Sequence, residues 1–102
     1  EKNNSNILEI GPGTGNLTKK IIAQKPKNLI LVEKDQELAK ELKNTLGKFN
    51  KLKIFNKDIL KFDIEKYVQK NSIIIGNLPY NISSQILIKL IKFLWSPLCL
   101  PT

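Results

Sequence analysis

The sequence of 102 residues contains no arginine, no histidine and no methionine, and its only cysteine is Cys99. A single cysteine excludes an internal disulfide, so nothing in the sequence indicates an oxidising compartment. No apolar run is long enough to cross a bilayer, and the start lacks the basic-then-apolar pattern of a signal peptide. We therefore expect a cytoplasmic protein that makes no use of a membrane.

The sequence has 17 basic and 9 acidic residues, which give a net charge of +8. Such a balance favours polyanionic partners, nucleic acid above all. Every basic residue is a lysine, and the lysines are spread from Lys2 to Lys92 without forming a compact block. With abundant asparagine and isoleucine, this composition is also what an AT-rich genome produces. The charge alone therefore does not establish nucleic-acid binding.

The two ends differ from those of an ordinary complete domain. Residue 1 is a glutamate, and "LWSPLCLPT" at the other end has two prolines and no periodicity. We expect residues 1–94 to form a partial domain and residues 95–102 an irregular tail. A truncation, a shifted reading frame and an ordinary exposed tail are all compatible with this terminus.

Apolar runs alternate with amphipathic segments, which predicts βαβ units and a parallel sheet. The predicted strands are 6–10, 28–34, 51–58 and 72–78. The predicted helices are 16–24, 36–46 after an Asp35 cap, a short one at 63–69, and a last one from Ser83 or Ser84 to about 93. Such a chain is half of a doubly wound α/β fold.

Three apolar patterns predict which faces are buried. Leu17, Ile21 and Ile22 should share one face of the first helix. The leucines spaced by four should do so in the second helix, which Gly47 follows. These leucines are Leu38, Leu42 and Leu46. Three successive isoleucines at 73–75 indicate a buried fourth strand.

The motif "EIGPGTGN" joins the first strand to the first helix. Gly11 and Gly13 allow positive φ angles and close approach of a ligand, and the helix start offers free N–H groups. A dinucleotide fingerprint has glycines at its first, third and sixth positions. Here the third glycine is Gly15, at the fifth position, and Asn16 takes the sixth. The spacing favours S-adenosylmethionine over NAD, although a purely structural tight turn remains possible.

Carboxylates follow the next two strands. Glu33 ends the second strand, where it can accept both hydroxyl hydrogens of a ribose. Asp58 ends the third, where it can accept a hydrogen bond from an adenine amino group while Ile59 packs on the ring. The alternatives are a solvated strand-end charge for Glu33 and a helix cap for Asp58. The carboxyl ends of parallel strands meet at one edge, so a shared ligand site is expected there.

The fourth strand leads into Asn77, Leu78, Pro79 and Tyr80. The Asn77 side-chain oxygen and the Leu78 carbonyl are two acceptors that can draw an adenine amine towards a more nucleophilic form, without any histidine base. Pro79 restricts Leu78 to extended conformations, and Tyr80 offers a face for stacking on a base withdrawn from its own stack. The alternative is an ordinary turn with a buried tyrosine.

With these motifs the sequence resembles the ribosomal RNA adenine dimethyltransferases of the KsgA type, through "EIGPGTGNLT", "LVEKD", "NKDIL" and "GNLPYNIS". The resemblance implies a Rossmann-like class I methyltransferase that uses S-adenosylmethionine to dimethylate two adjacent adenosines near the 3′ end of small-subunit rRNA. It places Gly11, Glu33, Asp58 and Asn77 at the cofactor. It also places Asn77 to Tyr80 at the target adenine. Methyltransferases of the Erm type, which act on the large subunit, are similar.

The chain departs from this family in extent. It lacks the motif before the first strand, the later strands and the C-terminal helical RNA-binding domain. We therefore expect a fragment with little or no activity, monomeric and without a metal, whose partner is small-subunit rRNA. A non-catalytic RNA-binding relic is the main alternative. A nicotinamide dehydrogenase is disfavoured by the position of the third glycine and by the Asn-Leu-Pro-Tyr turn.

Overall fold

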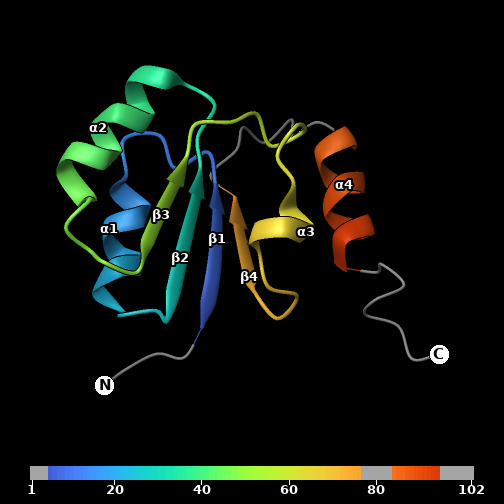
Figure 1. Cartoon of the computed structure of the whole chain (residues 1–102), viewed down its shortest axis with the longest axis horizontal. Helices are drawn as coiled ribbons and strands as arrows, with labels where there is room; N and C mark the ends of the chain where they lie inside the picture. Colours follow the sequence, from blue (N-terminus) through green and yellow to red (C-terminus); the bar gives the residue numbers. More distant parts are fainter. Residues whose placement is uncertain (1–4, 77–83, 95–102) are drawn as a thin grey trace.

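A computed structural model describes residues 5–76 and 84–94. Strands and helices alternate along these residues, as the sequence predicts (Figure 1). In chain order they are β1 (Asn6–Ile10), α1 (Asn16–Ala23), β2 (Asn28–Val32), α2 (Gln36–Leu46), β3 (Leu52–Phe55), α3 (Ile64–Tyr67), β4 (Ile73–Gly76) and α4 (Ser84–Leu94).

The four strands form one parallel sheet in the order β3-β2-β1-β4. Helices α1 and α2 cover one face, and α3 and α4 cover the other (Figure 1). The chain adds β2 and β3 on one side of β1 and then crosses to add β4 on the other. This reversal makes the carboxyl end of β1 a topological switch point, where open α/β sheets bind their ligands. The predicted Rossmann-like α/β fold is confirmed.

The side chains of alternate strand residues pack into two hydrophobic cores, one on each face of the sheet. Leu8 and Ile10 of β1 face α3 and α4, whereas Ile7 faces α1 and α2. The core under α3 and α4 contains Leu8, Ile10, Val32, Ile59, Phe62, Ile64, Val68 and Phe93. The core under α1 and α2 contains Ile7, Ile21, Leu29, Leu31 and Leu42. Strand β1 is buried along its whole length because both faces are covered.

The helix caps explain where two helices begin. The Asp35 carboxylate accepts a hydrogen bond of 3.0 Å from the Leu38 N–H, which confirms the predicted cap of α2. Asp63 caps α3 in the same way through the Lys66 N–H, at 3.3 Å. Strands β2 and β3 end earlier than predicted, so that Glu33 and Asp58 lie in the loops just beyond the sheet.

The predicted buried faces of α1 and α2 need correction. Leu17 is 36% exposed, and the buried residues of α1 are Thr18 and Ile21. Helix α1 is turned so that Thr18 faces the sheet, because its hydroxyl is paired there with a buried carboxyl of β1. In α2, Leu42 is buried as predicted, but the other buried position is Ala39, and the outer leucines of the predicted stripe are only partly covered. The buried pair is Ala39 and Leu42, and the partly buried pair is Leu38 and Leu46.

The prediction that the isoleucines of β4 are buried is wrong. Ile73 is 50% exposed, and Ile74 and Ile75 are only partly covered. Within residues 5–76 and 84–94, β4 pairs with β1 alone, so it is an edge strand. An apolar run at an edge looks the same in the sequence as a run at the centre of a sheet.

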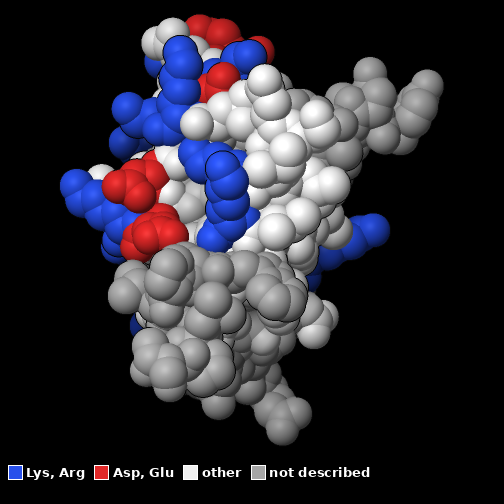
Figure 2. Space-filling view, turned by 90° about the vertical axis from the view of Figure 1, so that its right-hand side faces the viewer, with Lys and Arg blue, Asp and Glu red and all other residues white. Residues whose placement is uncertain are grey.

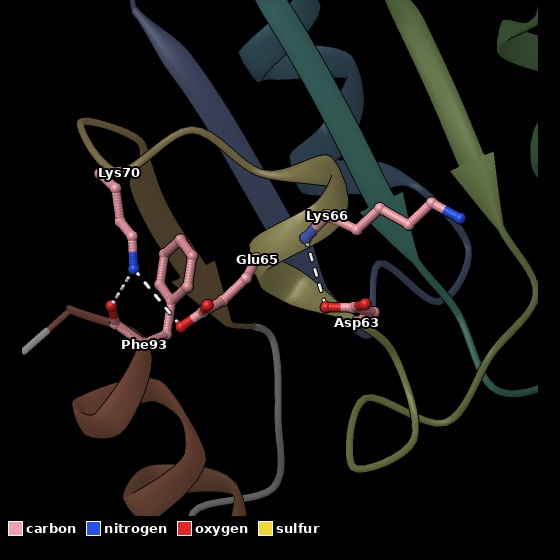
Figure 3. Close-up of polar contacts among 5 residues, drawn as sticks. All are labelled: Asp63, Glu65, Lys66, Lys70 and Phe93. Carbon is pink, nitrogen blue, oxygen red and sulfur yellow. Dashed lines mark hydrogen bonds and ion pairs between the residues drawn. The ribbon is translucent and has the colours of Figure 1, made fainter. Parts of the chain in front are cut away.

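Hydrogen bonds from two lysine side chains connect α4 to the rest of the domain. The Lys70 ammonium donates to the Phe93 carbonyl oxygen at 2.7 Å, lies 4.3 Å from the centre of the Phe93 ring and is 3.5 Å from the Glu65 carboxylate (Figure 3). Lys89 reaches from α4 to the Phe62 carbonyl oxygen at 2.6 Å. A cation at the carbonyl end of a helix also interacts favourably with the helix dipole.

The outer surface of α4 is apolar. Leu87, Ile88, Ile91 and Leu94 are each between 43% and 51% exposed. Figure 2, which views the molecule from the α4 side, shows an uncharged area beside a strip of lysines and acidic residues. Along the described ranges, none of the helices has the length and apolar character needed to cross a membrane.

Candidate functional site

The glycine turn has the backbone conformation that the sequence predicts. Gly11, Gly13 and Gly15 have φ angles of 67°, 60° and 88°, all in the left-handed region that favours glycine. Hydrogen bonds close the turn, from the Gly15 N–H to the Pro12 carbonyl at 3.0 Å and from the Gly11 N–H to the Val32 carbonyl at 2.9 Å. The turn is thereby held against the end of β2.

Gly13 and Gly15 serve different purposes in this turn. A Cβ atom added at Gly13 would meet nothing within 4 Å, so the backbone there borders open space. A Cβ added at Gly15 would lie 2.8 Å from Leu42 Cδ2, so the absent side chain lets the turn pack against α2. The surface at Gly13 can therefore admit a ligand close to the main chain. Contact between Gly15 and a cofactor stays a prediction beside this packing role.

Glu33 is brought next to the glycine turn, as its position at the end of β2 predicts. Its side chain is buried, with 6% of its surface exposed, and is not the solvated charge of the alternative interpretation. One carboxylate oxygen accepts the Gly13 N–H at 2.9 Å, and the other accepts the Asp35 N–H at 2.9 Å. Each oxygen has a second lone pair, so the carboxylate can still accept hydrogen bonds from two hydroxyl groups.

Asp58 and Ile59 follow β3 and have structural partners of their own. The Asp58 carboxylate accepts the Leu60 N–H at 3.0 Å and so closes a turn. It does not cap a helix, because the next helix, α3, begins at Ile64 and is capped by Asp63. Ile59 is 6% exposed and belongs to the core under α3 and α4. The adenine contacts expected of these two residues remain predictions.

A buried carboxyl that the motif spacing does not single out lies beneath the turn. Glu9, two positions before Gly11, is fully buried, and one of its oxygens accepts a 2.5 Å hydrogen bond from the Thr18 hydroxyl. Its other oxygen has no hydrogen-bond partner among the described residues. Burial raises the pKa of Glu9, and the hydrogen bond from Thr18 opposes this only in part. An acidic residue inside a strand buried on both faces is the sequence signal that could have revealed it.

Asn56 is a second residue at this edge that the motifs did not reveal. It follows the last residue of β3, and its amide nitrogen donates to the carbonyl oxygens of Glu33 at 2.9 Å and Lys34 at 3.1 Å. The strand ends of β1, β2 and β3 are therefore joined through Gly13, Glu33 and Asn56.

The predicted catalytic residues Asn77, Leu78, Pro79 and Tyr80 lie outside the described residues, and their roles stay predictions. The point from which they follow is described: Gly76, the last residue of β4, pairs with Ile10, which directly precedes Gly11. Over the described part of the chain, no group of three or more histidine, cysteine or acidic side chains has the arrangement of a metal site.

Comparison with solved structures finds methyltransferases with the same arrangement. A dimethyladenosine transferase from Plasmodium falciparum superposes with a TM-score of 0.73 and 33% identity, over 89% of this chain and 32% of that one. The 23S rRNA methyltransferase ErmE superposes with a TM-score of 0.69 and 29% identity, over 85% of this chain and 34% of that one.

Sequence comparison gives relatives of one kind. The ribosomal RNA small subunit methyltransferase A of Pelagibacter ubique is 51% identical over 86 residues, which are 84% of this chain and 32% of that protein. The enzyme of the same name from Malacoplasma penetrans is 44% identical over 90% of this chain and 33% of its own length. The chain thus spans about a third of the length of these curated relatives. The family model for ribosomal RNA adenine dimethylase matches residues 2–99, and the chain belongs to that family.

Proposed function

We propose that this chain carries the cofactor site and the amine-activating segment of an S-adenosylmethionine-dependent rRNA adenine N6-dimethyltransferase. The observation that supports this most directly is the pairing of the Gly13 N–H with the buried Glu33 carboxylate at the switch point of the sheet. The substrate that we propose is a pair of adjacent adenosines near the 3′ end of small-subunit rRNA, in keeping with the names of the relatives. We expect the protein to act in the cytoplasm, where small subunits are assembled.

The residues at the strand ends fit an adenosine-containing cofactor. Gly13 leaves open space beside the main chain, and Glu33 keeps acceptor capacity for the two ribose hydroxyls. Asp58 is the acceptor proposed for the adenine amino group, and Gly11 holds the turn to β2. When bound, S-adenosylmethionine would supply the methyl group of its sulfonium for transfer to the adenosine amine; the sulfur would keep the electron pair of the S–C bond and the amine would release a proton to water.

The chain's own contribution to the transfer would come from the segment after β4. The Asn77 side-chain oxygen and the Leu78 carbonyl would accept the two amine hydrogens and orient the nitrogen lone pair. Pro79 would fix the direction of that carbonyl, and Tyr80 would stack on the adenine. Positioning and electrostatic stabilisation would thus do the work that a general base does in other enzymes.

Methyl transfer from tritium-labelled S-adenosylmethionine to immature small subunits tests the proposal, using a full-length family member that carries this sequence. We expect Asn77→Ala to abolish transfer while calorimetry shows that cofactor binding is largely kept. A Ser84→Ala variant, at the first residue of α4, is the matched control and should transfer normally. Undiminished transfer by Asn77→Ala would contradict the catalytic assignment.

A non-catalytic RNA-binding protein is the second candidate, favoured by the net charge of +8. Binding of rRNA without any binding of S-adenosylmethionine by the 102-residue chain would support it. The likeness to ErmE keeps a large-subunit substrate as a further alternative, which methylation of purified large subunits would reveal.

A further inference from the structure

Asn56 lies where the ladder between β2 and β3 stops. The last paired residues are Val32 and Phe55, and one more backbone bond joins the Glu33 N–H to the Phe55 carbonyl at 3.0 Å. Beyond this point the Asn56 side chain continues the connection, because its amide nitrogen reaches the carbonyl oxygens of both Glu33 and Lys34. The main chain of Glu33 is therefore held on both of its hydrogen-bonding groups by residues at the end of β3.

The chemistry of this clamp requires a side-chain amide. A primary amide nitrogen carries two hydrogens and can satisfy two carbonyl oxygens at once. A carboxylate of the same shape has no hydrogen to donate and would face both carbonyl oxygens with a negative charge. Alanine would leave the two carbonyls to water, and glutamine would place the nitrogen one methylene further from the chain.

The clamp acts on the part of Glu33 that determines where its carboxylate points. That carboxylate is fixed by the N–H groups of Gly13 and Asp35, at 2.9 Å each, so both ends of the residue are tied. We propose that Asn56 is a positioning residue, which holds the Glu33 carboxylate where it could accept the ribose hydroxyls of the cofactor. This inference rests on the proposed cofactor site and adds a residue to it.

Hydrogen exchange measured by NMR on the 102-residue chain tests the clamp without any ligand. In Asn56→Ala we expect the Gly13 and Asp35 N–H groups to exchange about tenfold faster, because the acceptor of both is no longer held. The Gly11 N–H, bonded to the Val32 carbonyl, should keep its rate. Asn50→Ala, an exposed asparagine before β3, is the matched control and should change none of them. Unchanged exchange at Gly13 in Asn56→Ala overturns the proposal.

Calorimetry with S-adenosylhomocysteine then tests the consequence for binding through a double-mutant cycle. Asn56→Ala and Glu33→Gln should each weaken binding about tenfold or more, and the double variant should be little worse than Glu33→Gln alone. Losses that multiply would show that Asn56 acts independently of Glu33 and would overturn its positioning role. Absence of binding by the unmodified chain would instead count against the proposed function, while the exchange experiment decides on the clamp.

Discussion

The two sides of the sheet switch point are built differently. On one side, β1 is buried along its whole length and β2 at three of its five residues. Their carboxyl ends are joined to that of β3 through Gly13, Glu33 and Asn56. On the other side, Ile73 of β4 is 50% exposed and α4 carries a row of half-exposed apolar side chains. Helix α4 is held to the residues on either side of α3 by hydrogen bonds of Lys70 and Lys89. Gly13 and Glu33 of the proposed cofactor site thus lie on the more deeply buried of the two sides.

The difference in burial between the two sides should produce a difference in stability. Apolar burial stabilises a fold by about 25 cal/mol per Å² removed from water, so side chains left half-exposed contribute about half of what buried ones do. Regions with fewer buried contacts open more readily than the core. We therefore expect the β1–β2 side to be the more stable half of the domain, and four experiments test this difference.

The largest effect should come from truncating the buried side. Leu31 of β2 is fully buried, so Leu31→Ala should lower the free energy of unfolding by about 2–5 kcal/mol, measured by urea denaturation. Leu87→Ala, at a residue of α4 that is 50% exposed, is the matched variant and should cost less than about 1 kcal/mol. Equal losses in the two variants would erase the proposed difference between the halves.

The glycine turn should separate stability from binding. Gly15→Ala combines a φ of 88° with a contact to Leu42 and should cost about 2–3 kcal/mol of stability. Gly13→Ala carries the strain of its φ alone, about 1–2 kcal/mol, but should weaken S-adenosylhomocysteine binding because its methyl group occupies the open space. If Gly13→Ala bound the ligand normally, the ligand would not approach the turn at that residue.

Glu9 should make the buried side sensitive to pH. Burial raises its pKa in the folded state above the usual value of about 4.5, so the folded protein holds this proton more tightly than the unfolded chain. Its contribution to stability is therefore greatest below that value and is lost as the pH rises through the raised pKa. In Glu9→Gln this decline should disappear from the pH profile of urea unfolding. A profile identical to that of the unmodified chain would contradict the assignment.

The smallest effect should come from releasing α4. Lys70→Met removes a hydrogen bond to the Phe93 carbonyl at the end of that helix and should cost about 0.5–1.5 kcal/mol. Faster amide exchange in α4, with unchanged exchange in β1, would show that the loss is local. Lys40→Met, on the exposed side of α2, is the control and should leave both unchanged. A global loss of protection would mean that the two halves are not separable.

Spacing and periodicity predicted the features that depend on neighbours in the sequence. They located β1 and the start of α4, the Asp35 cap and the left-handed turn at Gly11 and Gly13, since turn and cap residues act over a few positions. The spacing also predicted that Glu33 and Gly13 lie together, because the parallel order brings strand ends to one edge.

Features that depend on distant partners were not predicted. Asn56 bonds to backbone carbonyls 22 and 23 positions away, which leave no side-chain pattern to recognise. Glu9 and Thr18 pair across the interface between β1 and α1, where Thr18 takes the inward position that apolar periodicity assigned to Leu17. The exposure of Ile73 depends on which strands flank β4, and periodicity carries no such information.

The strand order also has a consequence for how the protein is made. Because β1 lies between β2 and β4, its two edges are paired at different times during synthesis: β2 emerges from the ribosome soon after β1, whereas β4 is the last of the four described strands to appear. The nascent chain can therefore assemble β1, β2 and β3 with α1 and α2 before β4 is available to pair with the other edge of β1. During that interval β1 exposes unpaired backbone groups on this edge, which a chaperone can cover or another strand can mispair with.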